Sequence, residues 1–110
     1  MHPGNLWGGG GTIHSATVGA GGGTSGSFTT GQIVTVFVTT DTAVSRVSVS
    51  NASGVEEGFA NTFTTSGGLR IWTISFAAPT VTSTHNFTVN GTDSAGRASA
   101  SPRTVQVIVQ

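Results

Sequence analysis

Hydrophobic and polar residues alternate along most of this chain, with the period of two that is typical of β-strands. The alternation is clearest in residues 32–39, 69–76 and 104–109. Residues 13–18 and 85–91 show it over shorter runs and predict two further strands. The apolar positions that share a face predict a common core, formed by Val34, Val36, Val38, Val47, Val49, Trp72, Ile74, Phe76, Phe87, Val89, Val105 and Val107.

Turn-forming residues separate the apolar runs at spacings near ten to fifteen residues. Asn, Asp, Gly and Pro cluster at 41–43, 51–54, 66–68, 77–79 and 93–96. Val44 is out of phase with Val47, so we expect a strand that begins near Val47. Residues 55–65 contain Phe59 and Phe63 and predict one or two short strands. No segment shows a helical period, so the pattern predicts an all-β, immunoglobulin-like β-sandwich of about seven antiparallel strands.

The first 27 residues differ in composition from the rest because two glycine runs, 8–11 and 21–23, interrupt them. We expect residues 1–11 to form a flexible Gly-rich tail or linker and residues 12–110 to form the sandwich. Residues 13–18 would then be a first edge strand. A chain of 110 residues suits one domain, and because it has 0 Cys its core must hold without disulfides.

The charge count excludes several classes of partner. Only 7% of the residues are charged, Lys is absent, and the net charge is +0. The four Arg are scattered, whereas a nucleic-acid binder needs a basic stripe. No apolar run approaches the roughly 18 residues of a membrane helix, so we expect no membrane insertion. Surfaces of Thr and Ser hydroxyls are common on secreted bacterial and phage proteins, which favours an extracellular, cell-surface or phage location.

Several motifs resemble bacterial immunoglobulin-like and fibronectin type III-like modules over residues 28–110. They are the strand at residues 31–36, the run Ile-Trp-Thr-Ile-Ser-Phe at 71–76, the Thr-Asp-Ser-Ala-Gly turn at 92–96, and the terminal Val-x-Val-x-Val. The chain departs from antibody-type domains because it has no cysteine pair and because Trp72 lies late in the sequence. Without Lys it cannot form a Lys–Asn isopeptide bond. The resemblance implies a spacer, stalk or adhesive unit of a larger surface or phage protein, although fold does not fix function.

The residues that could support catalysis do not form a recognisable motif. His14 or His85 with Asp41 or Asp93 could supply a base and a carboxylate for a serine nucleophile, but no Gly-x-Ser-x-Gly sequence occurs. We expect both histidines to be exposed on strands. The adjacent pair at residues 56–57 is Glu-Glu, which we expect in a solvated loop rather than across a cleft. We therefore expect no enzyme activity and no catalytic residue.

Metal and ligand sites are equally sparse. Asp93, with Asn90 and nearby carbonyls, offers few oxygens for calcium, so we expect a turn in which the Asp93 side chain accepts from the Ala95 or Gly96 amide and Gly96 has positive φ. His2 with His14 is a weaker metal pair still, and we predict no metal and no cofactor.

We interpret three further features in structural rather than functional terms. Trp72 is expected in the core, whereas the packing of Trp7 stays open. The loop at residues 19–26 lacks the Lys of a phosphate cradle. The sequons at Asn51, Asn86 and Asn90 are expected to arise by chance in a Thr/Ser-rich chain.

These observations predict a non-catalytic structural or spacer module of an extracellular multidomain protein or phage particle. Its expected partners are neighbouring domains of the same chain. The alternative is an adhesive module that binds a carbohydrate or a protein through its Thr/Ser/Asn faces and through the loops at residues 54–59 and 93–103. An exposed aromatic platform or a large apolar patch would favour this alternative.

Overall fold

The computed structural model describes residues 10–19 and 22–110, so the expectations for Trp7, His2 and most of the 1–11 segment lie outside the described residues. The described part contains nine strands and no helix. The strands are β1 (Ile13–Val18), β2 (Ser25–Phe28), β3 (Ile33–Thr40), β4 (Arg46–Ser50), β5 (Glu56–Ala60), β6 (Thr64–Ser66), β7 (Leu69–Ala77), β8 (Thr84–Thr92) and β9 (Arg103–Val109).

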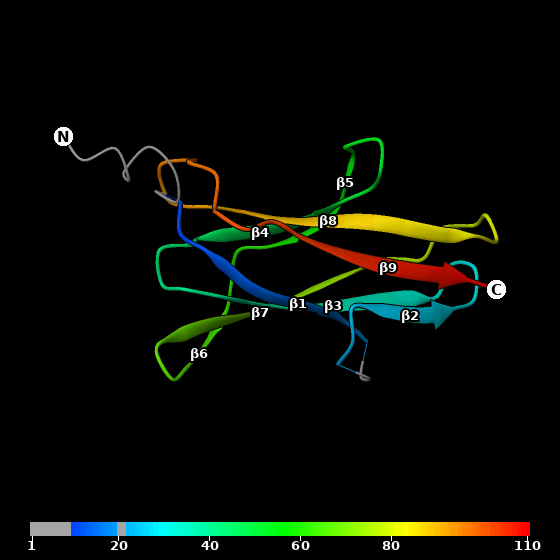
Figure 1. The fold of residues 1–110 in the computed structure, drawn as a ribbon, viewed down its shortest axis with the longest axis horizontal. Helices are drawn as coiled ribbons and strands as arrows, with labels where there is room; N and C mark the ends of the chain where they lie inside the picture. Colours follow the sequence, from blue (N-terminus) through cyan, green and yellow to red (C-terminus); the bar gives the residue numbers. More distant parts are fainter. Residues whose placement is uncertain (1–9, 20–21) are drawn as a thin grey trace.

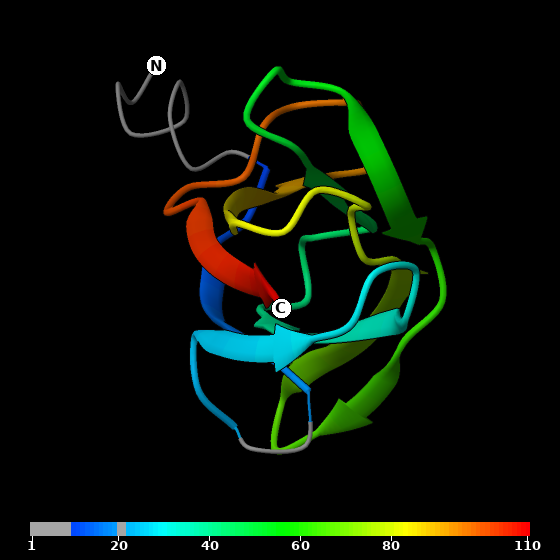
Figure 2. The same ribbon diagram turned by 90° about the vertical axis from the view of Figure 1, so that its right-hand side faces the viewer.

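The strands form two sheets that pack face to face as a sandwich (Figure 1). One sheet has the order β1-β3-β7-β6 and the other has the order β2-β9-β8-β4-β5. The strands other than β2 can be matched in chain order to strands A, B, C, C′, D, E, F and G of an immunoglobulin domain. The first sheet then has the order A-B-E-D. The second has the order G-F-C-C′, with β2 added at the edge beside G. The predicted immunoglobulin-like sandwich is therefore confirmed, and Figure 2 shows its layers from the end at which β9 finishes.

The two inner faces enclose the core that the alternation predicts. All twelve predicted core residues are buried. The core also includes Ile13, Ala16 and Val18 of β1, and Val44, which precedes β4. The strand that contains Val47 begins at Arg46, close to the predicted start. β3, β7 and β9 bury alternate residues, so period-two patterning accounts directly for these parts of the sandwich interior.

The structure corrects several expectations about the strands. The described residues form nine strands rather than about seven, and β2 lies partly within the segment interpreted as a glycine-rich loop. β2 pairs parallel with β9, from Ser25 opposite Gln106 to Phe28 opposite Val109, so the sheets are not wholly antiparallel. The Glu56–Glu57 pair lies on β5 and not in a loop, although both side chains are exposed as expected.

The main chain enters and leaves the sandwich at opposite ends. β1 starts beside the start of β9, where the Arg103 guanidinium donates to the Ile13 carbonyl. β9 then runs to the other end, where the Val109 amide donates to Ser83 and the Gln110 amide donates to Phe28. At about 3.3 Å per residue, the seven residues of β9 separate the entry end from the exit end by about 20 Å (Figure 1).

Candidate functional site

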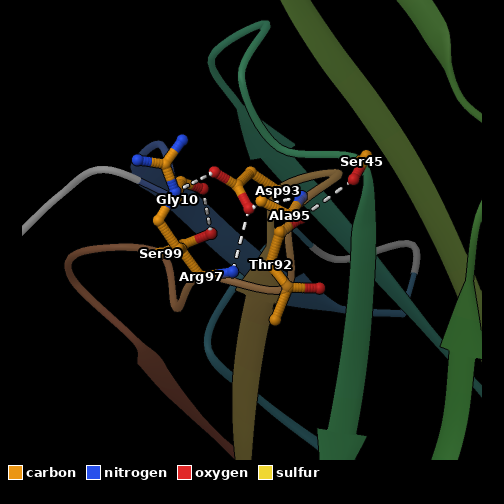
Figure 3. A network of polar contacts seen from close by, with 7 residues as sticks. All are labelled: Gly10, Ser45, Thr92, Asp93, Ala95, Arg97 and Ser99. Carbon is orange, nitrogen blue, oxygen red and sulfur yellow. Dashed lines mark hydrogen bonds and ion pairs between the residues drawn. The ribbon is translucent and has the colours of Figure 1, made fainter.

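A polar network occupies the entry end, within the loop that connects β8 to β9. The Asp93 carboxylate organises the loop locally, because its Oδ1 accepts from the backbone amides of Ala95 and Arg97, both at 2.9 Å. Its Oδ2 accepts from Arg97 Nε at 2.8 Å, and Gly96 has φ +82°. The predicted turn is thus present, with the Arg97 amide rather than the Gly96 amide as the second donor to the side chain (Figure 3).

These contacts explain the acidity of Asp93. The backbone N–H of Arg97, the Arg97 guanidinium and the Ala95 N–H all stabilise the ionised carboxylate, while burial opposes it. The net effect lowers the pKa of Asp93 below its ordinary value of 3.8. The carboxylate therefore stays charged at neutral pH, with both oxygens committed to its own loop.

The same loop holds the segment through which the chain enters the fold. Ser99, which is buried, donates its hydroxyl to the Gly10 carbonyl at 2.7 Å, and the Ala100 amide donates to the Gly11 carbonyl at 2.7 Å. On the opposite side, both the amide and the hydroxyl of Ser45 donate to the Thr92 carbonyl. Figure 3 shows how residues distant in sequence converge on this loop. The entry segment is thereby fixed to the sandwich by paired backbone and side-chain contacts.

Glycine is required where the entry segment meets the loop. A Cβ on Gly10 would collide with the Arg97 carbonyl oxygen. Gly11 has φ +86°, and a Cβ there would lie 2.6 Å from Asp41 Oδ1. Both glycines belong to the segment predicted as a tail, yet Gly10 and Gly11 are buried. The predicted boundary at residue 12 stays a prediction, because residues 1–9 lie outside the described part.

The candidate catalytic residues are not assembled into a catalytic array within the described part of the chain. His14 is exposed on β1, and the half-buried His85 on β8 has its Nε2 2.7 Å from the Val81 carbonyl oxygen. Neither imidazole is hydrogen-bonded to an Asp or a Ser hydroxyl among the described residues. Asp41 instead accepts from the Ala43 amide at 3.1 Å. Each of these groups therefore supports its own local turn or strand.

The other acidic and amide side chains considered as candidate ligands take part in local structural contacts. Within residues 10–19 and 22–110 no three His, Asp or Glu side chains gather as metal ligands. Glu56 pairs with Arg46 at 2.9 Å, and Glu57 accepts from Asn51 Nδ2 at 2.9 Å. Asn51 Oδ1 in turn accepts from the amides of Ser53 and Val55. None of the described segments forms a helix able to cross a bilayer.

The aromatic side chains divide between core and surface. Trp72 is fully buried, and its indole Nε1 donates to the Thr40 hydroxyl at 2.8 Å. Phe63 packs on it at 4.9 Å between ring centroids and is covered in turn by Arg70 at 4.0 Å. Phe59, which is 52% exposed, lies under Arg46 at 4.5 Å. The predicted core position of Trp72 is confirmed. Phe59 and Phe63 are each capped by an arginine, whereas Phe37 on β3 is 40% exposed.

The sequence analysis did not predict the long-range hydrogen bonds of the polar network at the entry end. Ser99 and Gly10 are separated by 89 positions, and no local motif marks either one. A signal did exist for the glycines, because a Gly run next to a strand can mark close backbone approach as well as flexibility. Only the contacts of these glycines with the loop at residues 97–100 distinguish close backbone approach from flexibility.

The arrangement is an immunoglobulin-like β-sandwich in which a polar network holds the segment that enters the fold. Neither a family model nor a curated protein matches the sequence. Among solved structures, the chain is similar to that in the crystal structure of CopC from Methylosinus trichosporium OB3b, with 10% identity, 91% of this chain and 93% of that chain covered, and a TM-score of 0.43.

Proposed function

We propose that this chain is a non-catalytic spacer module that carries tension between neighbouring segments of an extracellular, cell-surface or phage protein. The observation that supports the proposal is the placement of entry and exit at opposite ends of the sandwich, about 20 Å apart along β9. A module of this geometry separates its neighbours by its own length.

The terminal strands also suit a chain under tension. β1 and β9 both run from the entry end toward the exit end. Tension pulls β1 back toward the entry and β9 outward at the exit, along the strand axes. Hydrogen bonds between antiparallel strands lie perpendicular to the strands, so the β1–β3 and β8–β9 ladders are loaded together rather than one bond at a time.

The entry network extends this resistance. Ser99 and Ala100 hold the Gly10 and Gly11 carbonyls before β1 begins, and Arg103 holds the Ile13 carbonyl. These contacts connect the first described residues directly to the loop and the start of β9. Tension applied at the entry end is thus shared between both sheets.

Single-molecule force spectroscopy tests the proposal. Because the chain has 0 Cys, handles can be attached at introduced cysteines without a competing thiol. Handles at the two termini should give a higher unfolding force than handles at Ala52→Cys and Thr82→Cys. The latter pair pulls the adjacent strands β4 and β8 apart from one end. Equal forces in the two geometries would contradict a tension-bearing role.

A further inference from the structure

A groove of about 420 Å³ runs along the side of the sandwich where β1 approaches β2 and β9. Its polar lining consists of one guanidinium, one imidazole and four hydroxyls, from Arg103, His14, Ser15, Thr17, Thr24 and Thr104. No carboxylate from residues 10–19 or 22–110 lines the groove. Its volume lies within the range of small-molecule sites, and its polar groups come from three separate segments of the chain.

Arg46 pairs with Glu56 and Arg97 pairs with Asp93, whereas Arg70 and Arg103 have no carboxylate partner among the described residues. Arg70 lies over the Phe63 ring and donates to the Val44 carbonyl, away from the groove. Among residues 10–19 and 22–110, Arg103 donates only to the Ile13 and His14 carbonyls, and it lines the groove. A carbonyl fixes the guanidinium but does not neutralise it, so a full positive charge is held in place at the groove.

The contacts of Arg103 leave part of its guanidinium group available for a ligand. Nε and Nη2 donate to the Ile13 carbonyl, each at 3.3 Å, and Nη2 also donates to the His14 carbonyl at 2.9 Å. Nη1 donates to no atom of residues 10–19 or 22–110. An exposed guanidinium that is hydrogen-bonded on one side, with further N–H groups on the other, can bind an oxyanion.

We propose that this groove binds an acidic saccharide, with Arg103 on the carboxylate of a uronic acid unit and the hydroxyls of Ser15, Thr17, Thr24 and Thr104 on the sugar. This activity goes beyond the spacer role and does not depend on it. Each hydroxyl both donates and accepts, as sugar hydroxyls do, so the two sets are chemically matched. A peptide added along β1 is disfavoured, because Arg103 already occupies the Ile13 and His14 carbonyls that such a strand would need.

Calorimetric titration of the full chain with trigalacturonate, compared with its methyl ester, tests the charge requirement. The two probes share every ring hydroxyl and differ only at the carboxylates. We expect the methyl ester to bind at least about tenfold more weakly, since a charge-assisted hydrogen bond is lost. Equal binding of both probes, or binding of neither, would overturn the proposal.

Variants then locate the site. Arg103→Gln should weaken trigalacturonate binding about tenfold, whereas Arg46→Gln removes the same charge from another strand and should leave binding unchanged. Because Arg103 also holds β1, Thr104→Val provides a second variant that leaves those carbonyl contacts intact. It should weaken binding about fivefold with an unchanged circular dichroism spectrum. Equal losses in Arg103→Gln and Arg46→Gln would indicate diffuse charge attraction and refute the assignment.

Competition by sodium sulfate separates a saccharide site from a bare anion site. Sulfate satisfies Arg103 but cannot use the surrounding hydroxyls in the same way. Trigalacturonate should therefore bind at least about tenfold more tightly than sulfate. Comparable affinities would refute the saccharide assignment.

Discussion

Replacement of Trp72 by Ala should remove the largest single contribution to the core. The side chain is 0% exposed, packs against Phe63, and donates to the Thr40 hydroxyl, which is itself buried. Truncation of a buried Trp costs about 3–5 kcal/mol, from lost transfer free energy and the cavity left behind. Because a domain has only about 5–15 kcal/mol of total stability, this substitution should remove a large part of it.

Two milder variants separate packing from hydrogen bonding. Trp72→Phe keeps most of the ring and removes the N–H, so we expect a cost of about 2 kcal/mol. Thr40→Val preserves the shape but leaves the buried indole N–H without an acceptor, which costs about 1–3 kcal/mol. If the hydrogen bond stabilises the fold, the double variant should cost less than the sum of the single ones.

Urea unfolding followed by far-ultraviolet circular dichroism measures these costs without relying on tryptophan fluorescence. The slope with urea should stay constant across variants while the midpoint falls. A loss below about 1 kcal/mol for Trp72→Ala would refute the core assignment. A fully additive double variant would refute a stabilising role for the Trp72–Thr40 hydrogen bond.

Three further predictions concern the entry end and the surface. The folded pKa of Asp93 is lowered, so its contribution is present above the unfolded value near 3.8 and is lost as pH falls through the folded value. In urea titrations, Asp93→Asn should therefore be less stable than wild type at pH 7 and approach it in acid; a constant difference would contradict this. Gly11→Ala should cost about 1–3 kcal/mol because φ is +86° and Asp41 lies too close, and an unchanged melting temperature would argue against a fixed entry segment. Ile33→Thr should change stability by less than about 0.5 kcal/mol, since Ile33 is 63% exposed, and a larger loss would mean that the outer face is covered.

Local patterns were sufficient for the strands that bury alternate residues. Val34, Val36 and Val38 appear on one face in the sequence and are buried together in β3, because strand geometry converts spacing directly into sidedness. The Asp93 turn was predictable for a similar reason, since its donors lie within four residues. The sequence did not predict that Phe59 and Phe63 lie beneath Arg46 and Arg70, because those pairs depend on which strands become neighbours.

β2 shows where sequence reasoning failed. Its residues, Ser-Gly-Ser-Phe, have almost no apolar alternation, and only Phe28 packs on the core. The strand exists because its backbone pairs in parallel with β9, about eighty positions further along the chain. Backbone hydrogen bonds carry no side-chain signature, so the composition of this segment indicated a loop.

The all-β class, the buried faces and the tight turns follow from the amino-acid sequence, because each depends on residues only a few positions apart. The contacts of Gly10 and Gly11 with the loop at residues 97–100, and the position of Arg103 beside four hydroxyls without a carboxylate partner among the described residues, follow only from the tertiary structure. These features join segments separated by nearly ninety residues. Their positions depend on how the two sheets stack and on which strand edges meet. The same alternating sequence pattern is compatible with every such arrangement, so it does not predict these contacts.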